Sequence, residues 1–328
     1  MQSWRPNTLN QYNVYLKKWI SFCSTQDHQP LERNDLLCLE FLRRLLKFNY
    51  SYSAINSARS ALSCIFDNPP FGELPLVTRF MKSVYNIKPH QPRYHKTWDV
   101  STVLKYLEKC SPAKFLSRQQ LSYKLVTLLA LVTGQRVQTL HALNLDFCHF
   151  TQQGAIFNIT TILKHSSPKN ICDNKIFIPY FGDNRKICPI TCLKQYIERT
   201  KSVRQSQQLF LGVQKPFKPV SKSTLSRWIK TTLSKAGINT DVFKSHSTRA
   251  ASSSAAAESI DISLVLKAGN WSRASTFHKY YHKEVEEDRN SFGKEVLKKL
   301  QVSTIISLCF FFLLSLSLLH SRVSCDNF

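Results

Sequence analysis

Acidic residues are scarce in this chain of 328 residues: Asp and Glu together number 21, against 45 Lys and Arg. The resulting formal charge of +24 is spread along the whole chain rather than confined to a tail. An excess of this size causes self-repulsion unless a polyanion neutralises it, which points to nucleic acid as the partner. We expect the chain to bind through phosphate contacts that weaken as salt is added.

The chain also has no C-x-x-C pair among its ten cysteines. The spacing of Cys188 and Cys192 is not that of a zinc site, so we expect no structural metal. The polar residues 1–6 are unlike a secretory signal, and cysteines such as Cys23 and Cys38 fall within apolar helical patterns. Free, buried thiols in a reducing compartment are therefore the expectation.

One uncharged, apolar run stands near the C-terminus, over residues 302–319. Its length is just sufficient for a transmembrane helix or a tail anchor. The run is rich in Phe, Leu and Ser and begins abruptly, which favours a non-native C-terminus such as translated non-coding sequence. We therefore expect no association with a membrane.

Apolar residues recur at three- and four-residue spacing through residues 1–87, which predicts a helical first domain. A basic linker that contains prolines follows over residues 88–96. Residues 97–297 then mix helices with two β-branched segments at 155–163 and 174–179, and the polar loop between these segments predicts a hairpin. The expected fold class is mainly α, with a small antiparallel β-sheet in the second domain.

Six residues in the second domain supply what is needed to cut a phosphodiester without a metal. They are Arg136, Lys164, His246, Arg249, Trp271 and one tyrosine of the pair Tyr280 and Tyr281. Guanidinium groups can hydrogen-bond the non-bridging oxygens on which charge accumulates as phosphorus becomes five-coordinate. A tyrosine hydroxyl can act as the nucleophile, and a phosphotyrosine linkage conserves the bond energy for rejoining.

The order and spacing of these residues resemble the tyrosine recombinase (phage integrase-like) family over residues 5–297. The resemblance is carried by Thr133-Gly-Gln-Arg136, Leu163-Lys164, His246-Ser-Thr-Arg249 and Trp271-Ser. These motifs look most like those of recombinases from DIRS/Ngaro-like retrotransposons and Cryptons. The resemblance implies a helical, SAM-like core-binding domain over 1–87 and an α/β catalytic domain over 97–297, which close as a C-shaped clamp on double-stranded DNA.

The resemblance also implies a role for each residue. Arg136 and Arg249 would clamp the scissile phosphate, and His246 would exchange a proton with the tyrosine or the phosphate. The ring N–H of Trp271 would donate to a non-bridging oxygen. Thr139 stands where the family commonly carries an acidic residue, so Arg136 must be oriented by other groups.

Two assignments keep alternatives. The family carries its lysine on the predicted hairpin, where an ammonium can protonate the departing 5′ oxygen; we favour Lys164, with Lys169 and Lys175 as the alternatives. Adjacent helical residues point about 100° apart, so only one tyrosine of the pair can face the phosphate. We favour Tyr281 as the nucleophile and keep Tyr280, which has the spacing usual in bacterial and phage members.

These features predict a site-specific recombinase or integrase that cleaves and rejoins DNA through a 3′-phosphotyrosyl intermediate, for integration of a mobile element. No cofactor is expected, because the arginines and the lysine supply the charge stabilisation. The resemblance further implies a homotetramer on DNA and a location in the nucleus. A type IB topoisomerase-like enzyme and a domesticated, non-catalytic DNA-binding protein are the alternatives.

Overall fold

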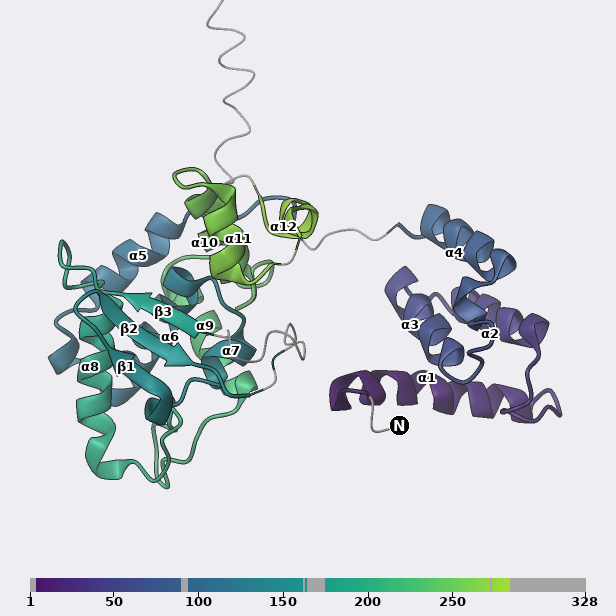
Figure 1. Cartoon of the computed structure of the whole chain (residues 1–328), viewed down its shortest axis with the longest axis horizontal. Coiled ribbons are helices and arrows are strands. Elements are labelled where there is room, and N and C mark those ends of the chain that lie inside the picture. Colours follow the sequence, from purple (N-terminus) through teal and green to yellow (C-terminus); the bar gives the residue numbers. More distant parts are fainter. Residues whose placement is uncertain (1–3, 90–93, 162, 164–174, 272, 284–328) are drawn as a thin grey trace, which may run out of the picture. The chain divides into compact units, whose positions relative to one another are not determined.

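The computed structural model describes residues 4–89, 94–161, 163, 175–271 and 273–283 (Figure 1). The chain divides into two compact units, Met1–Arg93 and Tyr94–Phe328. The apolar run 302–319 lies outside the described residues. Within the described ranges, no helix is both long enough and apolar enough to cross a membrane.

The first unit is a set of helices joined by short turns. Its elements are α1 (Pro6–Ser24), α2 (Asp35–Lys47), α3 (Tyr52–Ser63), the 3₁₀ helix η1 (Phe71–Glu73) and α4 (Pro75–Ile87). Side-chain caps fix where α2 and α3 begin. Asn34 and Ser51 each accept a hydrogen bond from a backbone N–H of the first turn that would otherwise lack a partner. The fully buried Trp19 packs against Phe41 and other apolar side chains to form the core of this unit.

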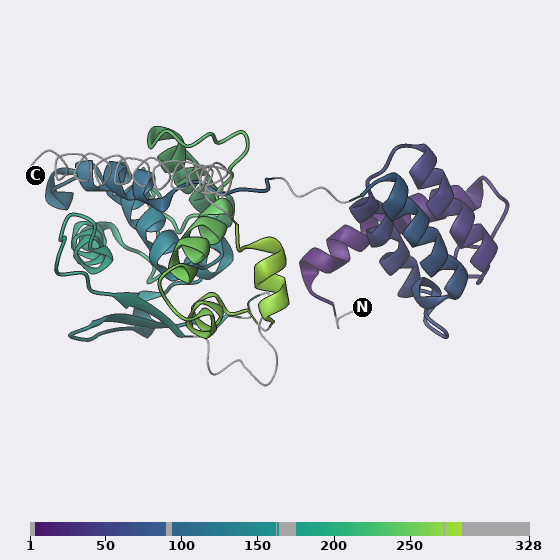
Figure 2. The ribbon, with the colours of Figure 1, turned by 90° about the horizontal axis from the view of Figure 1, so that it is seen from above.

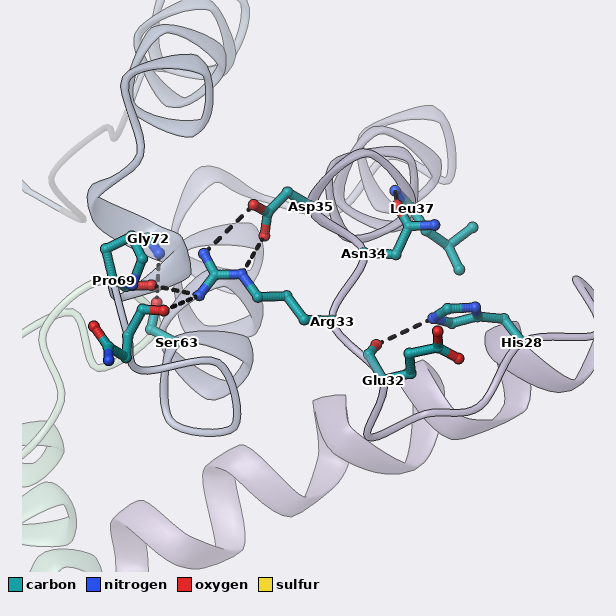
Figure 3. Close-up of polar contacts among 10 residues, drawn as sticks. His28, Glu32, Arg33, Asn34, Asp35, Leu37, Ser63, Pro69 and Gly72 are labelled. Carbon is teal, nitrogen blue, oxygen red and sulfur yellow. Dashed lines mark hydrogen bonds and ion pairs between the residues drawn. The ribbon is translucent and has the colours of Figure 1, made fainter.

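Arg33 ties the loop before α2 to the turn that follows α3 (Figure 3). Its guanidinium group donates to the Asp35 carboxylate and to the backbone carbonyls of Asn68 and Pro69. A planar fork can serve several acceptors at once, whereas a lysine ammonium would fit them less well. Arg33 is therefore committed to a structural contact, and the basic residues of this unit are not all available to a polyanion.

The second unit combines helices with a small sheet. Its elements are α5 (Val100–Lys109), η2 (Ala113–Phe115), α6 (Arg118–Thr133), α7 (Val137–His141), η3 (Leu145–Phe147), β1 (Cys148–Phe150), β2 (Gly154–Asn158), β3 (Lys175–Pro179), α8 (Pro189–Thr200), η4 (Lys201–Val203), α9 (Lys222–Lys235), α10 (Ser247–Ala257), α11 (Ile262–Gly269) and α12 (Ala274–Tyr280).

Helix α6 is the centre of this unit. It packs against α8, α9, α10 and β3. Most of its side chains beyond the first turn are buried, including Leu121, Leu125 and Leu128, as expected for a helix that other elements surround. Its start is fixed by a capping box between Ser117 and Gln120, and its end by Gly134 in the left-handed conformation (φ 57°). The residue after next, Arg136, is therefore held at the rigid end of a buried helix.

The sheet has the order β1-β2-β3, with both pairs antiparallel. The helices gather on one side of it, as the view from above shows (Figure 2). The chain is thus mainly helical with a small antiparallel sheet in its second unit, which confirms the predicted fold class.

Two details of the predicted sheet are wrong. The strand expected over 155–163 is shorter, since β2 spans Gly154–Asn158 and its last residue pairs with Lys175 of β3. The edge strand β1 is absent from the prediction, since three residues are too few for a period of two to be recognised.

Candidate active site

The small residues of α10 allow it to lie close to its neighbours, and Arg249 in its first turn is completely buried. The guanidinium Nη1 donates to the carbonyl oxygen of Gly134 at the end of α6, at 2.5 Å. Its Nη2 donates to the carbonyl oxygen of Gly269 at the end of α11, also at 2.5 Å. Arg249 therefore joins the turn that carries Arg136 to the turn that precedes Trp271.

Two aromatic rings cover Arg249. Its guanidinium carbon lies 3.8 Å from the centre of the Trp271 ring and 5.1 Å from that of Tyr281. Burial, together with repulsion from Arg136, lowers the pKa of Arg249 from its ordinary value to about 10. The group still carries its positive charge at neutral pH, and the ring faces stabilise that charge where the side chain is buried.

The structure distinguishes the two tyrosines. The hydroxyl of Tyr281 lies 3.5 Å from Nε2 of His246, and its ring centre lies 5.0 Å from that of Trp271. The Tyr280 side chain is 53% exposed and its ring contacts Lys279. Tyr281 therefore belongs to the cluster with His246, Arg249 and Trp271, whereas Tyr280 lies outside it.

The cluster is assembled from helices that lie side by side at one end of the second unit (Figures 1 and 2). His246 is the N-cap residue of α10, and Trp271 and Tyr281 flank α12. Phe277 of α12 packs against the Trp271 ring, with the two ring centres 5.1 Å apart. The apolar contacts among α10, α11 and α12 therefore hold the polar groups in one place.

Asn270, which separates Gly269 from Trp271, has a clear structural role. It ends α11 in the left-handed conformation (φ 54°), which asparagine tolerates better than most residues. The turn lets the backbone N–H of Trp271 donate to the carbonyl of Leu266 and lays the indole directly on Gly269. The extra residue thus forms the helix cap and leaves Trp271 within the cluster.

Two buried donors of the cluster remain unused. Nε1 of Trp271 and Nε of Arg249 make no hydrogen bond to any described residue. A buried donor without an acceptor is unfavourable, so such groups in a native site commonly await a ligand or a water. Both are available to the oxygens of an anion.

Gln135 also contributes to the site, although its sequence context did not predict it. This residue is 3% exposed, and its Nε2 donates to the carbonyl oxygen of Ala268 at 2.7 Å. Like the hydrogen bonds of Arg249, this bond joins the turn after α6 to the end of α11. Its position beside Arg136 in the Thr-Gly-Gln-Arg motif was visible, but a glutamine next to a turn is usually solvated, so its burial was not apparent from the sequence.

Arg136 itself is half-buried at the start of α7, where its carbonyl accepts from the backbone N–H of Thr139. Lys164 and Lys169 lie outside the described residues. Lys175, the remaining candidate lysine, is exposed at the beginning of β3. The structure therefore brings together five of the six predicted site residues: Arg136, His246, Arg249, Trp271 and Tyr281.

Comparison with known proteins identifies similar folds. Three solved structures have similar folds at low identity. A XerH site-specific recombinase in a post-cleavage complex with difH DNA has a TM-score of 0.60 and 14% identity over 88% of this chain and 78% of that one. A lambda integrase dimer bound to a core site has a TM-score of 0.53 and 17% identity over 87% and 91%. The Tn1549 transposon integrase with transposon right-end DNA has a TM-score of 0.53 and 12% identity over 80% and 85%.

No curated protein sequence is significantly similar to the chain. The sequence profile of the phage integrase family, however, matches residues 99–287, which is more than half of the 328 residues and includes the whole cluster described above. The chain therefore belongs to the phage integrase family, the tyrosine recombinases.

Proposed function

We propose that the protein is a site-specific DNA recombinase that cleaves and rejoins strands through a 3′-phosphotyrosyl intermediate. The observation that carries the proposal is the position of the Tyr281 hydroxyl, 3.5 Å from a histidine nitrogen, while its ring lies against a buried arginine. A hydroxyl beside a proton acceptor and a fixed cation is the arrangement that nucleophilic attack on a phosphodiester requires.

In the proposed reaction the Tyr281 oxygen attacks phosphorus and its proton passes to His246. The new bond joins phosphorus to the tyrosine oxygen, and the bond to the 5′ oxygen breaks. That oxygen leaves as a hydroxyl after it takes a proton from Lys164, or from Lys169 or Lys175 in the alternative assignments. A 5′-hydroxyl then gives its proton to the lysine and attacks phosphorus; the bond from phosphorus to the Tyr281 oxygen breaks, and that oxygen takes its proton back from His246.

Arg249 is suited to the five-coordinate phosphorus. A guanidinium group has five N–H donors. Two of them are committed to the carbonyls of Gly134 and Gly269, which fix the plane of the group and leave the others for phosphate oxygens. Because its side chain has no exposed surface, the phosphate reaches it only when the rings of Trp271 and Tyr281 move aside. We therefore expect DNA to open the cluster.

The proposed partner is double-stranded DNA. In the first unit, a cavity of about 660 Å³ has Lys17, Lys18 and Arg44 around it, with Phe48 and Tyr50 alongside. Lysine and arginine side chains around such a cavity can contact the phosphates of DNA. The similar solved structures named above are complexes with DNA. We further propose a homotetramer on DNA, a nuclear location and an origin in a mobile element of the DIRS/Ngaro or Crypton type.

Covalent trapping tests the chemistry. Nicked suicide duplexes that carry candidate element ends are incubated with wild type, Tyr281→Phe and Tyr280→Phe. We expect a protease-sensitive adduct that is lost in Tyr281→Phe and retained in Tyr280→Phe. Loss of the adduct in Tyr280→Phe alone would identify Tyr280 as the nucleophile. DNA binding by wild type without any adduct would indicate a non-catalytic binder, and supercoil relaxation without strand exchange would indicate a topoisomerase.

A further inference from the structure

A hydrogen bond between distant parts of the chain is made by the residue next to His246 of the cluster. The indole Nε1 of Trp98 donates to the Oγ of Ser247 at 2.9 Å, and both side chains are buried, at 4% and 1% exposure. Trp98 lies just before α5, in the first residues of the second unit. Ser247 is the first residue of α10 and the immediate neighbour of His246.

A second contact supports the same loop from the other side. The ring of Tyr94 lies 5.2 Å from that of Phe243, three residues before His246. The segment 94–98 therefore touches the chain both before and after His246. Helix α10 also begins without a side-chain cap, so the position of its first residues depends on such contacts with the rest of the unit.

We propose that Trp98 is a positioning residue that fixes His246 through its hydrogen bond to Ser247. The inference rests on the proposed function, in which His246 takes the proton of Tyr281. The separation of 3.5 Å between the two side chains is already long for a hydrogen bond, so a small displacement of His246 would slow proton transfer. The bond to Trp98 limits that displacement.

A purely structural role for Trp98 makes different predictions. Its ring belongs to the main hydrophobic core of the unit, so any truncation will lower stability to some degree. A packing defect would act without regard to the Ser247 hydroxyl. A positioning bond instead couples the two residues, so that removing either partner has the effect of removing both.

The experiment uses the full chain as wild type, Trp98→Phe, Ser247→Ala and the double variant. Trp228→Phe is the matched control, because Trp228 is a buried indole of the same core that packs on Phe210 and Tyr123 instead. Single-turnover adduct formation at saturating DNA, the Kd for DNA and the chemical shifts of the His246 ring are measured for each. Comparison with a His246→Gln sample assigns the ring signals.

We expect each single variant to form the adduct about tenfold more slowly than wild type, a part of what a general acid–base group contributes. The double variant should be no slower than the single ones, the Kd for DNA should not change, and the His246 signals should shift. Trp228→Phe should leave both the rate and the signals as in wild type.

The inference would be overturned if the rate losses of the two single variants multiplied in the double variant. It would also be overturned if the His246 signals did not shift in the single variants. The signals are read without any reaction, so they decide the position of His246 even where wild type forms no adduct. The absence of an adduct with wild type would count against the proposed function alone.

Discussion

At the scale of single residues, Arg249 is the group whose chemistry is hardest to replace. Lysine in its place would lose the fork that holds the carbonyls of Gly134 and Gly269, and with it the orientation of the remaining donors. We expect Arg249→Lys to lower the rate of adduct formation by about 10²–10³-fold, as loss of a transition-state donor does elsewhere. The exposed Arg273→Lys is the control, and quenched-flow trapping is the measurement. Wild-type rates in Arg249→Lys would exclude a clamp at this position.

The same residues show what a sequence can and cannot predict. The motifs around Arg249 and Trp271 led to their prediction as site residues, because their neighbours along the chain carry the signal, and the structure places the two side chains in contact. For the nucleophile the sequence favoured Tyr281 but kept Tyr280, since adjacent residues have almost the same spacing to every motif, and the structure places only Tyr281 beside His246. The bond from Trp98 to Ser247 was beyond prediction, because 149 residues separate its partners and neither belongs to a periodic pattern that would pair them.

At the scale of elements, the site depends on the close approach of the end of α11 to the Trp271 ring. A Cβ on Gly269 would lie 1.8 Å from the indole atom Cζ3, so an alanine there must displace the ring. We expect Gly269→Ala to lower the free energy of unfolding by about 1–3 kcal/mol and to slow adduct formation, because the displaced indole would no longer hold its N–H donor in the cluster. Urea unfolding and trapping measure the two effects. Gly212→Ala, whose added atom would meet nothing closer than 3.4 Å, should show neither effect, and equal losses in both variants would refute the argument.

At the scale of the whole molecule, the charge of +24 predicts how binding responds to salt. If the chain contacts about 6–10 phosphates, its affinity for duplex DNA should fall by about 10³–10⁵-fold between 50 and 200 mM salt. Lys17→Ala and Lys18→Ala, at the cavity of the first unit, should each weaken binding to all duplexes and reduce the slope of log Kd against log salt by about one. Fluorescence anisotropy over a salt series measures both quantities. Lys82→Ala removes an exposed charge of the same unit that does not line the cavity, so equal changes in all three variants would mean that the unit binds by its net charge and not through this surface.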